Sequence, residues 1–177
     1  MPAEAIDMIA IFSDTHSERD HDLEGEALTA AREADTVVHA GDFTSEAAFE
    51  AFQAECDRLF AVHGNADDAA VRDRLPTSRV LEREGVRIAV THRSDSGELG
   101  LAMLGRSRDA DLVVFGHSHR PAVIDAEDCL LLNPGSHADP RGNRPGFAVL
   151  EEGADGLEGA IREPDGTLIE SVTIDRA

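Results

Sequence analysis

The sequence contains no lysine, no tyrosine and no tryptophan, and it has only two cysteines. Its 16 cationic residues are therefore all arginines, and they form no basic cluster. Non-specific binding of a polynucleotide or an anionic membrane depends on clustered Lys and Arg, so we expect neither partner. Cys56 and Cys129 form no Cys-x-x-Cys motif, and the sequence predicts neither a disulfide framework nor a thiolate zinc site.

Long apolar segments are also absent. No stretch approaches the roughly 20 apolar residues that span a bilayer, and the first seven residues lack the basic and apolar regions of a signal peptide. We therefore expect a cytoplasmic protein. With 177 residues the chain can form one sizeable core, but it is shorter than the roughly 200 residues that a (β/α)₈ barrel requires. We expect a single domain spanning residues 1–177.

Negative charge is what the sequence has in excess. Its 36 Asp and Glu residues give a formal net charge of −20. Because 41% of the residues are hydrophobic, the chain is expected to fold, with the acids as a solvated coat whose mutual repulsion is screened at high salt. This pattern indicates a halophilic protein. A GC-rich genome is an alternative explanation for the missing lysine, but it does not explain the acidic excess.

Short apolar runs alternate with helical patterns in the first half of the sequence. Apolar runs predict strands, and apolar residues at helical spacing predict helices. The expected strands of this half are 8–12, 36–40 and 59–63, and the expected helices are 22–34, 46–55 and 67–75. The second half predicts a helix at 98–107 and strands at 79–82, 86–91, 112–115, 122–125, 130–132, 147–151, 157–162 and 168–174. This alternation indicates an α/β fold.

Polar residues directly follow five of the predicted strands. Because the carboxyl ends of parallel strands line one crevice, these residues are expected to form one site. Carboxylate, imidazole and amide groups without thiolates suit Mn²⁺, Fe²⁺, Co²⁺, Ni²⁺ or Zn²⁺. Seven candidates exceed what one ion needs and fit two ions that share a carboxylate. The candidate metal ligands are Asp14, His16, Asp42, Asn65, His92, His117 and His119.

The order Asp-x-His, Gly-Asp, Gly-Asn, His, Gly-His-x-His resembles that of the calcineurin-like metallophosphoesterases. Asn133-Pro134-Gly135-Ser136, followed by Pro140-Arg141-Gly142, is similar to the YfcE-type branch of small prokaryotic phosphodiesterases. The resemblance covers about residues 8–150. It implies a four-layer αββα sandwich with mixed β-sheets. It also implies a phosphodiesterase that acts on a small phosphoester or nucleotide-like substrate.

The resemblance further implies a role for each ligand. The implied sets are Asp14, His16 and His119 for one ion and Asn65, His92 and His117 for the other, with Asp42 as the bridge. The two divalent ions would be Mn²⁺, with Ni²⁺, Co²⁺, Fe²⁺ and Zn²⁺ as alternatives. A bridging hydroxide would attack phosphorus while the ions stabilise the phosphoryl oxygens. On this basis Asp42, Asn65 and His92 are expected to be catalytic.

Three further residues are candidates for the substrate side of the site. Arg141 would bind a substrate phosphate, with a surface ion pair as its alternative role. Asn133 lies in a loop near the site, and His137 would donate a proton to the leaving group. Many family members have a His after Gly-Asn for this donation, whereas this chain has Ala66. We therefore expect a preference for good leaving groups such as phenolates. A second departure is Arg93-Ser94, where the branch usually has Gly-His.

Two alternative functions stay open. A phosphomonoesterase would use the same ligands. A non-catalytic scaffold is the second alternative, because the retromer subunit of eukaryotes keeps this architecture for protein contacts. A scaffold could lose ligands freely, whereas this chain has all seven. The resemblance to the branch also suggests a homodimer or a homotetramer.

Overall fold

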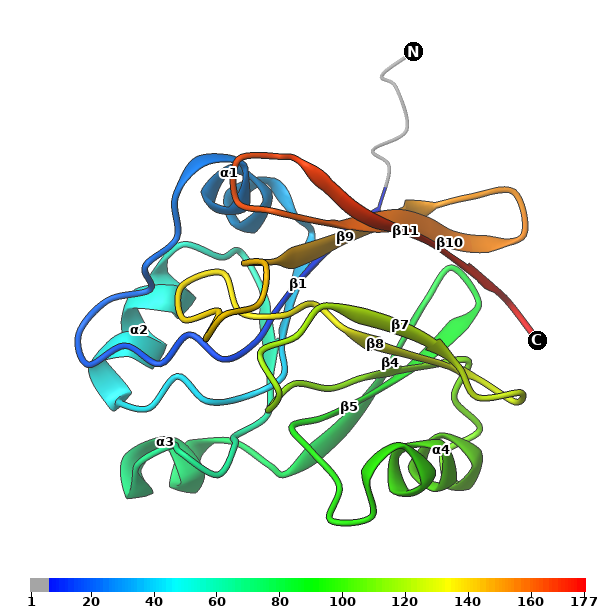
Figure 1. Cartoon of the computed structure of the whole chain (residues 1–177), viewed down its shortest axis with the longest axis horizontal. Helices are drawn as coiled ribbons and strands as arrows, with labels where there is room; N and C mark the ends of the chain where they lie inside the picture. Colours follow the sequence, from blue (N-terminus) through cyan, green and yellow to red (C-terminus); the bar gives the residue numbers. More distant parts are fainter. Residues whose placement is uncertain (1–6) are drawn as a thin grey trace.

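The computed structural model describes residues 7–177, which form two β-sheets and four helices (Figure 1). The first sheet consists of β1 (Met8–Phe12), β2 (Thr36–His39), β3 (Leu59–Ala61), β9 (Phe147–Glu152), β10 (Gly156–Arg162) and β11 (Leu168–Asp175). The second consists of β4 (Ser78–Arg83), β5 (Val86–Thr91), β6 (Leu112–Val114), β7 (Ala122–Asp125) and β8 (Leu130–Asn133). The helices are α1 (Gly25–Glu33), α2 (Glu46–Ala54), α3 (Ala69–Arg74) and α4 (Gly97–Ser107).

Both sheets are mixed. Their strand orders are β11-β10-β9-β1-β2-β3 and β4-β5-β6-β8-β7. In the first sheet β1, β2 and β3 are parallel, and β1 is antiparallel to β9. In the second sheet β5, β6 and β8 are parallel. The parallel strands place the loops that follow them at one edge of each sheet.

Buried apolar side chains form three core layers. The largest lies between the two sheets and includes Ile11 of β1 and Val90 of β5. A second layer packs the first sheet against α1, α2 and α3 and contains Phe52. The third contains Leu101, which joins α4 to the second sheet. Figure 1 shows α1 and α2 on one side of the sheets and α4 on the other. The predicted four-layer αββα sandwich is confirmed.

Two helices begin later than the sequence predicts. The helix expected from residue 22 begins at Gly25, because Asp22 has a φ of 53° and the N-cap residue Glu24 has an extended backbone. The helix expected from residue 67 begins at Ala69 because Asp68 is the N-cap, and its side chain accepts a hydrogen bond from the Val71 amide. In residues 7–177 the structure has no helix that is both long and apolar enough to cross a membrane.

Candidate metal centre

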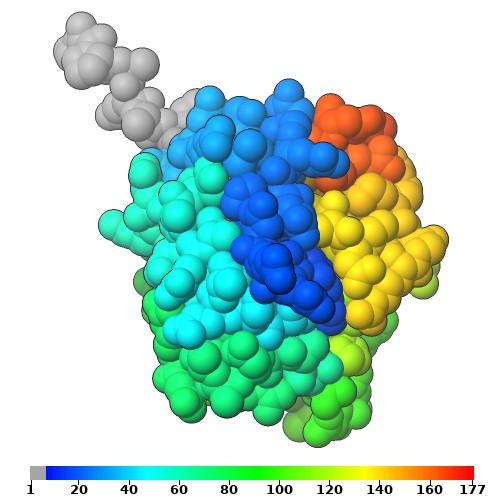
Figure 2. Space-filling model, turned by 90° about the vertical axis from the view of Figure 1, so that its left-hand side faces the viewer, coloured from blue at the N-terminus to red at the C-terminus, as the bar shows by residue number. Residues whose placement is uncertain are grey.

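Loops from both sheets meet at the site. Asp14 and His16 follow β1, Asp42 follows β2, and Asn65 follows β3. From the second sheet, His92 directly follows β5, and His117 and His119 follow β6. In Figure 2 the dark-blue segment after β1 lies on the surface between the cyan segment and the yellow segment, which are far apart in the sequence.

Two groups of ligand atoms lie close enough to hold a cation. One contains Asp14, His16 and His119, and the other contains Asp14, Asp42 and His92. His119 Nε2 is 3.4 Å from Asp14 Oδ1, and His92 Nε2 is 3.1 Å from Asp42 Oδ2. His16 Nε2 also lies 3.1 Å from Asp42 Oδ2. Asp14 and Asp42 are therefore the shared carboxylates of the centre.

Asn65 and His117 lie together at the exposed rim. Asn65 Oδ1 is 3.0 Å from His117 Nδ1, and the His117 amide donates to Asp14 Oδ2 over 3.0 Å. The structure thus brings all seven predicted ligands into one cluster. Its interior is buried, since Asp14, Asp42, His92 and His119 are each at most 3% exposed.

Two buried polar atoms in the cluster lack a hydrogen-bond partner among residues 7–177. They are Asp14 Oδ1 and His92 Nε2. Buried polar groups are nearly always paired, so such atoms need an explanation. Both belong to a group of potential cation ligands, and carboxylate and imidazole suit a divalent transition metal. The residues present therefore fit a divalent metal ion.

Backbone carbonyls orient two of the imidazoles. His92 Nδ1 donates to the Ala40 carbonyl over 2.8 Å, and His119 Nδ1 contacts the Asp139 carbonyl. With the proton held on Nδ1, Nε2 of each ring keeps its lone pair directed at the carboxylates. This is the tautomer that a metal ligand needs.

The carboxylates and imidazoles change each other's pKa values. The neighbouring carboxylates of Asp14 and Asp42 raise the pKa of His16 to about 9. Burial alone would raise the pKa of Asp42, but the neighbouring imidazoles of His16 and His92 lower it well below its usual range. The centre thus holds Asp42 ionised, which favours a bound cation.

Two glycines allow this close packing. A Cβ on Gly64 would overlap Asp42 Oδ1 and lie 2.8 Å from His92 Cγ. A Cβ on Gly116 would overlap the Ser13 hydroxyl and lie 2.5 Å from Asp14 Oδ2. The Gly-Asn and Gly-His motifs therefore need glycine, because any larger residue at these two positions would collide with the ligand side chains.

Sequence reasoning missed a supporting carboxylate, Asp67. Its Oδ2 accepts hydrogen bonds from the amides of Asp42 (3.0 Å) and Gly64 (2.7 Å), and its Oδ1 accepts one from Thr44 (2.7 Å). Asp67 is 4% exposed. It ties the loop after β2 to the loop after β3. The available signal was its position two residues after the Gly-Asn motif.

The three candidates for the substrate side differ in their surroundings. Arg141 is exposed, and its Nη2 lies 3.3 Å from His16 Nδ1. Asn133 ends β8, and its amide donates to the Gly116 carbonyl and to Ser118 Oγ, which holds the loop that carries His117. His137 is 6% exposed, packs edge-on against Phe12 and donates to the His21 carbonyl. We therefore leave His137 out of the reactive site.

Comparison with known proteins identifies relatives along most of the sequence. The profile of the "Calcineurin-like phosphoesterase superfamily domain" matches residues 8–155. A probable metallophosphoesterase of Methanothermobacter thermautotrophicus is 31% identical over 169 residues, covering 87% of this chain and 91% of the relative. A phosphodiesterase of Methanocaldococcus jannaschii is 25% identical, covering 81% of this chain and 92% of the relative.

Solved structures share the architecture. A predicted phosphoesterase from Streptococcus pneumoniae superposes with a TM-score of 0.76 at 24% identity, covering 98% of this chain and all of that chain. Vps29 of Chaetomium thermophilum gives a TM-score of 0.78 at 19% identity, covering 96% and 99%. Vps29 of Entamoeba histolytica, solved in complex with Zn²⁺, gives 0.75 at 19% identity, also covering 96% and 99%. At these identities the structures establish the fold alone.

Proposed function

The chain belongs to the calcineurin-like phosphoesterase superfamily, and from this premise we propose that it is a metal-dependent phosphodiesterase with two metal ions. The main support for this proposal is the cluster of seven potential ligands. Within residues 7–177, its atoms Asp14 Oδ1 and His92 Nε2 are buried and have no hydrogen-bond partner. The name of the M. jannaschii relative supports a diester substrate.

The proposed ligands divide into two sets. Asp14, His16 and His119 hold one ion. Asn65, His92 and His117 hold the other. Asp42 bridges them, because its Oδ2 faces His16 and His92 at 3.1 Å each. Mn²⁺ is the proposed metal, with Ni²⁺, Co²⁺, Fe²⁺ and Zn²⁺ as alternatives.

The bound ions would supply positive charge for the phosphoryl oxygens and lower the pKa of a water that attacks phosphorus. Within this arrangement the Asp42 carboxylate lies between His16 of one ligand set and His92 of the other. Arg141, beside His16, binds a phosphoryl oxygen of the substrate. Asn133 acts indirectly, by fixing the loop that carries His117.

The leaving group departs without help from a histidine after Gly-Asn. That position is Ala66, and its amide donates to Asp42 Oδ1 over 2.8 Å. His137 faces the core instead. The enzyme is therefore proposed to favour esters whose leaving groups need no proton, such as phenolates. Equal turnover of an alkyl diester and an aryl diester would contradict this preference.

A scaffold is the second candidate, because Vps29 structures match this fold closely. A yeast Vps29 is also 29% identical over 105 residues, 56% of this chain and 54% of the relative. A phosphodiesterase would use the ligand cluster to hydrolyse a phosphoester, whereas a scaffold would not.

The deciding experiment measures metal content and hydrolysis together. The full chain is purified in high salt, its metals are counted, and bis(p-nitrophenyl) phosphate and p-nitrophenyl phosphate are assayed with Mn²⁺, Co²⁺ or Ni²⁺. Asp42→Asn should abolish metal-dependent hydrolysis. Asp57→Asn is the matched control, because Asp57 is exposed and lies before β3, at the opposite end of that strand from Asn65. Hydrolysis in the wild type no greater than in Asp42→Asn would favour the scaffold.

A further inference from the structure

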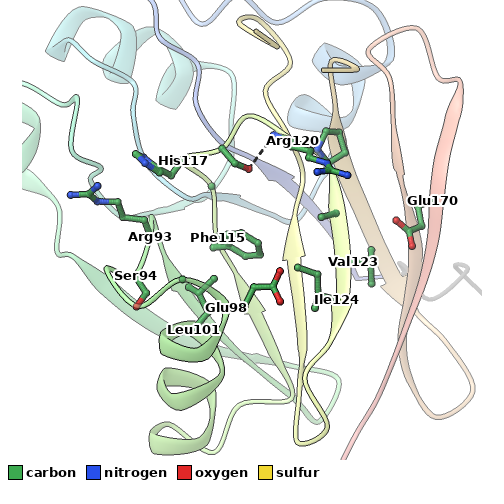
Figure 3. Close-up of a pocket in the computed structure, with 15 residues that line it drawn as sticks. Arg93, Ser94, Glu98, Leu101, Phe115, His117, Arg120, Val123, Ile124 and Glu170 are labelled. Atoms are coloured by element: carbon green, nitrogen blue, oxygen red, sulfur yellow. Dashed lines mark hydrogen bonds between the residues drawn. The ribbon is translucent and has the colours of Figure 1, made fainter. Parts of the chain in front are cut away.

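A cavity of about 570 Å³ adjoins the metal centre on the side of the second sheet. It lies between the start of α4, the loop after β6, and β7 (Figure 3). The proposed ligand His117 forms part of its wall. A phosphate bound at the metal centre would therefore have an ester group within reach of this cavity.

Apolar side chains form most of the interior. They are Leu101 of α4, Phe115 after β6, and Val123 and Ile124 of β7. Figure 3 shows Phe115 between Leu101 and the two β7 side chains. Phe115, Val123 and Ile124 are only half-buried, so they have apolar surface left to bury. An aromatic ring suits such a cavity because it buries a large apolar area and packs well on another ring.

The cavity wall carries two arginines, Arg93 and Arg120, and two glutamates, Glu98 and Glu170. Within residues 7–177 the guanidinium of Arg120 makes no hydrogen bond or ion pair, and only its backbone amide is engaged, with Ser118 Oγ. In the described part of the chain, Arg93 is paired only with the exposed Asp95 at 3.8 Å, an interaction worth little in water. Neither guanidinium group is neutralised by a close acidic partner in this part of the chain, and Figure 3 shows Arg93 beside His117 and Arg120 on the opposite side of the cavity.

We propose that this cavity binds an aromatic ester group of the substrate, with Arg93 and Arg120 supplying positive charge that attracts its phosphate. The proposal rests on the proposed function, since it places the phosphate at the metal centre. It also gives a role to Arg93-Ser94, the second departure from the family pattern, because both residues line the cavity.

The test is binding of two phosphonates that are not hydrolysed. Phenylphosphonate and methylphosphonate are titrated into the Mn²⁺-loaded full chain at high salt and followed by calorimetry. We expect the Kd of phenylphosphonate to be about tenfold lower, since the ring buries apolar surface in the cavity. Ile124→Glu should reduce this ratio to below about threefold. Met103→Glu, which adds the same charge at a site 61% exposed on α4, should preserve it.

Arg120→Gln separates the anion contact from the ring contact. Arg120 is exposed, so this variant should fold even where Ile124→Glu does not. It should weaken both phosphonates by about fivefold and leave their ratio unchanged. Equal or undetectable binding of the two phosphonates in the wild type overturns the proposal, as does unchanged affinity in Arg120→Gln or an unchanged ratio in folded Ile124→Glu.

Binding and turnover give separable answers. A preference for phenylphosphonate without hydrolysis of any phosphoester supports the cavity and rejects the phosphodiesterase. Hydrolysis of diesters without a preference for phenylphosphonate supports the phosphodiesterase and rejects the cavity proposal.

Discussion

Most of the proposed ligands have unusual backbone conformations. A positive φ is uncommon outside glycine and costs on the order of 1–3 kcal/mol, so it persists only where the surrounding structure imposes it. Here the amides of Asp14 and His16 are held by the carbonyls of Gly41 and Asp42 over 2.9 and 3.0 Å. Such concentrated strain is typical of functional sites. The ligands with positive φ are Asp14 (56°), His16 (45°), Asp42 (65°), His117 (74°) and His119 (58°).

The first prediction concerns Gly64. In Gly64→Ala the new methyl group would overlap Asp42 Oδ1 and contact His92 Cγ, so both ligands must move. We expect loss of bound metal and a decrease in diesterase activity of about 100-fold or more, because misplacement by about 1 Å has such effects. Gly166→Ala, in the turn between β10 and β11 with φ of 96°, should cost stability and leave the metal content unchanged. Full metal content in Gly64→Ala would contradict the prediction.

The second prediction concerns Asp67. In Asp67→Asn one of the two side-chain atoms becomes a donor and can no longer accept from the amides of Asp42, Gly64 or Thr44. We expect a decrease of about 1–3 kcal/mol in the free energy of unfolding and weaker metal binding. Denaturant titration and metal titration measure the two effects. Asp68→Asn is the control, since Asn also caps helices well. Equal effects in both variants would show that Asp67 has no special role.

At the scale of elements, the sequence predicted the strands and the order of the ligand loops. Apolar runs and helical spacing are local signals, and the carboxyl-end rule then placed Asp14, Asp42 and His117 at one edge. The surroundings of His137 depend on contacts that no local pattern encodes. Its ring packs on Phe12 and Phe52, from β1 and α2. The same holds for Asp67, whose partners include residues 23 and 25 positions away.

The third prediction concerns this packing of His137. Burial lowers the pKa of His137 to about 4 from an ordinary value of 6.5. The unfolded chain therefore binds a proton between these values while the folded chain does not, and stability that is present above pH 6.5 is lost as the pH falls to about 4. We expect this loss to be smaller in His137→Gln by about 2–3 kcal/mol, since Gln does not titrate and can still donate to the His21 carbonyl.

Denaturant unfolding at several pH values in the presence of EDTA measures the effect without contributions from bound metal. Burial also lowers the pKa of His39, so part of the acid sensitivity should persist in the variant. Identical pH profiles for the wild type and His137→Gln would show that His137 is not a source of acid sensitivity.

At the scale of the whole molecule, a charge of −20 coexists with a proposed site for an anionic substrate. Many arginines are engaged by acids at the surface, as in Arg106–Asp128 and Arg32–Glu55, both at 2.7 Å. Exposed pairs of this kind contribute at most about 1 kcal/mol each. Two divalent ions would add positive charge at one point and turn the ligand cluster into an anion-attracting site.

The last prediction concerns the exposed acidic residues that are not paired with arginines. Repulsion among exposed carboxylates destabilises the folded chain, and the Debye length falls from about 10 Å at 0.1 M salt to about 3 Å at 1 M. We expect the Tm of the metal-free protein to rise by about 5–10 °C between these concentrations, equivalent to about 2–3 kcal/mol for a chain of this size. Because the Debye length shortens most at low concentration, most of the rise should occur below about 0.5 M. Scanning calorimetry in NaCl and in KCl should give the same curve, whereas a Tm that is flat to 1 M would show that the acidic coat does not limit stability.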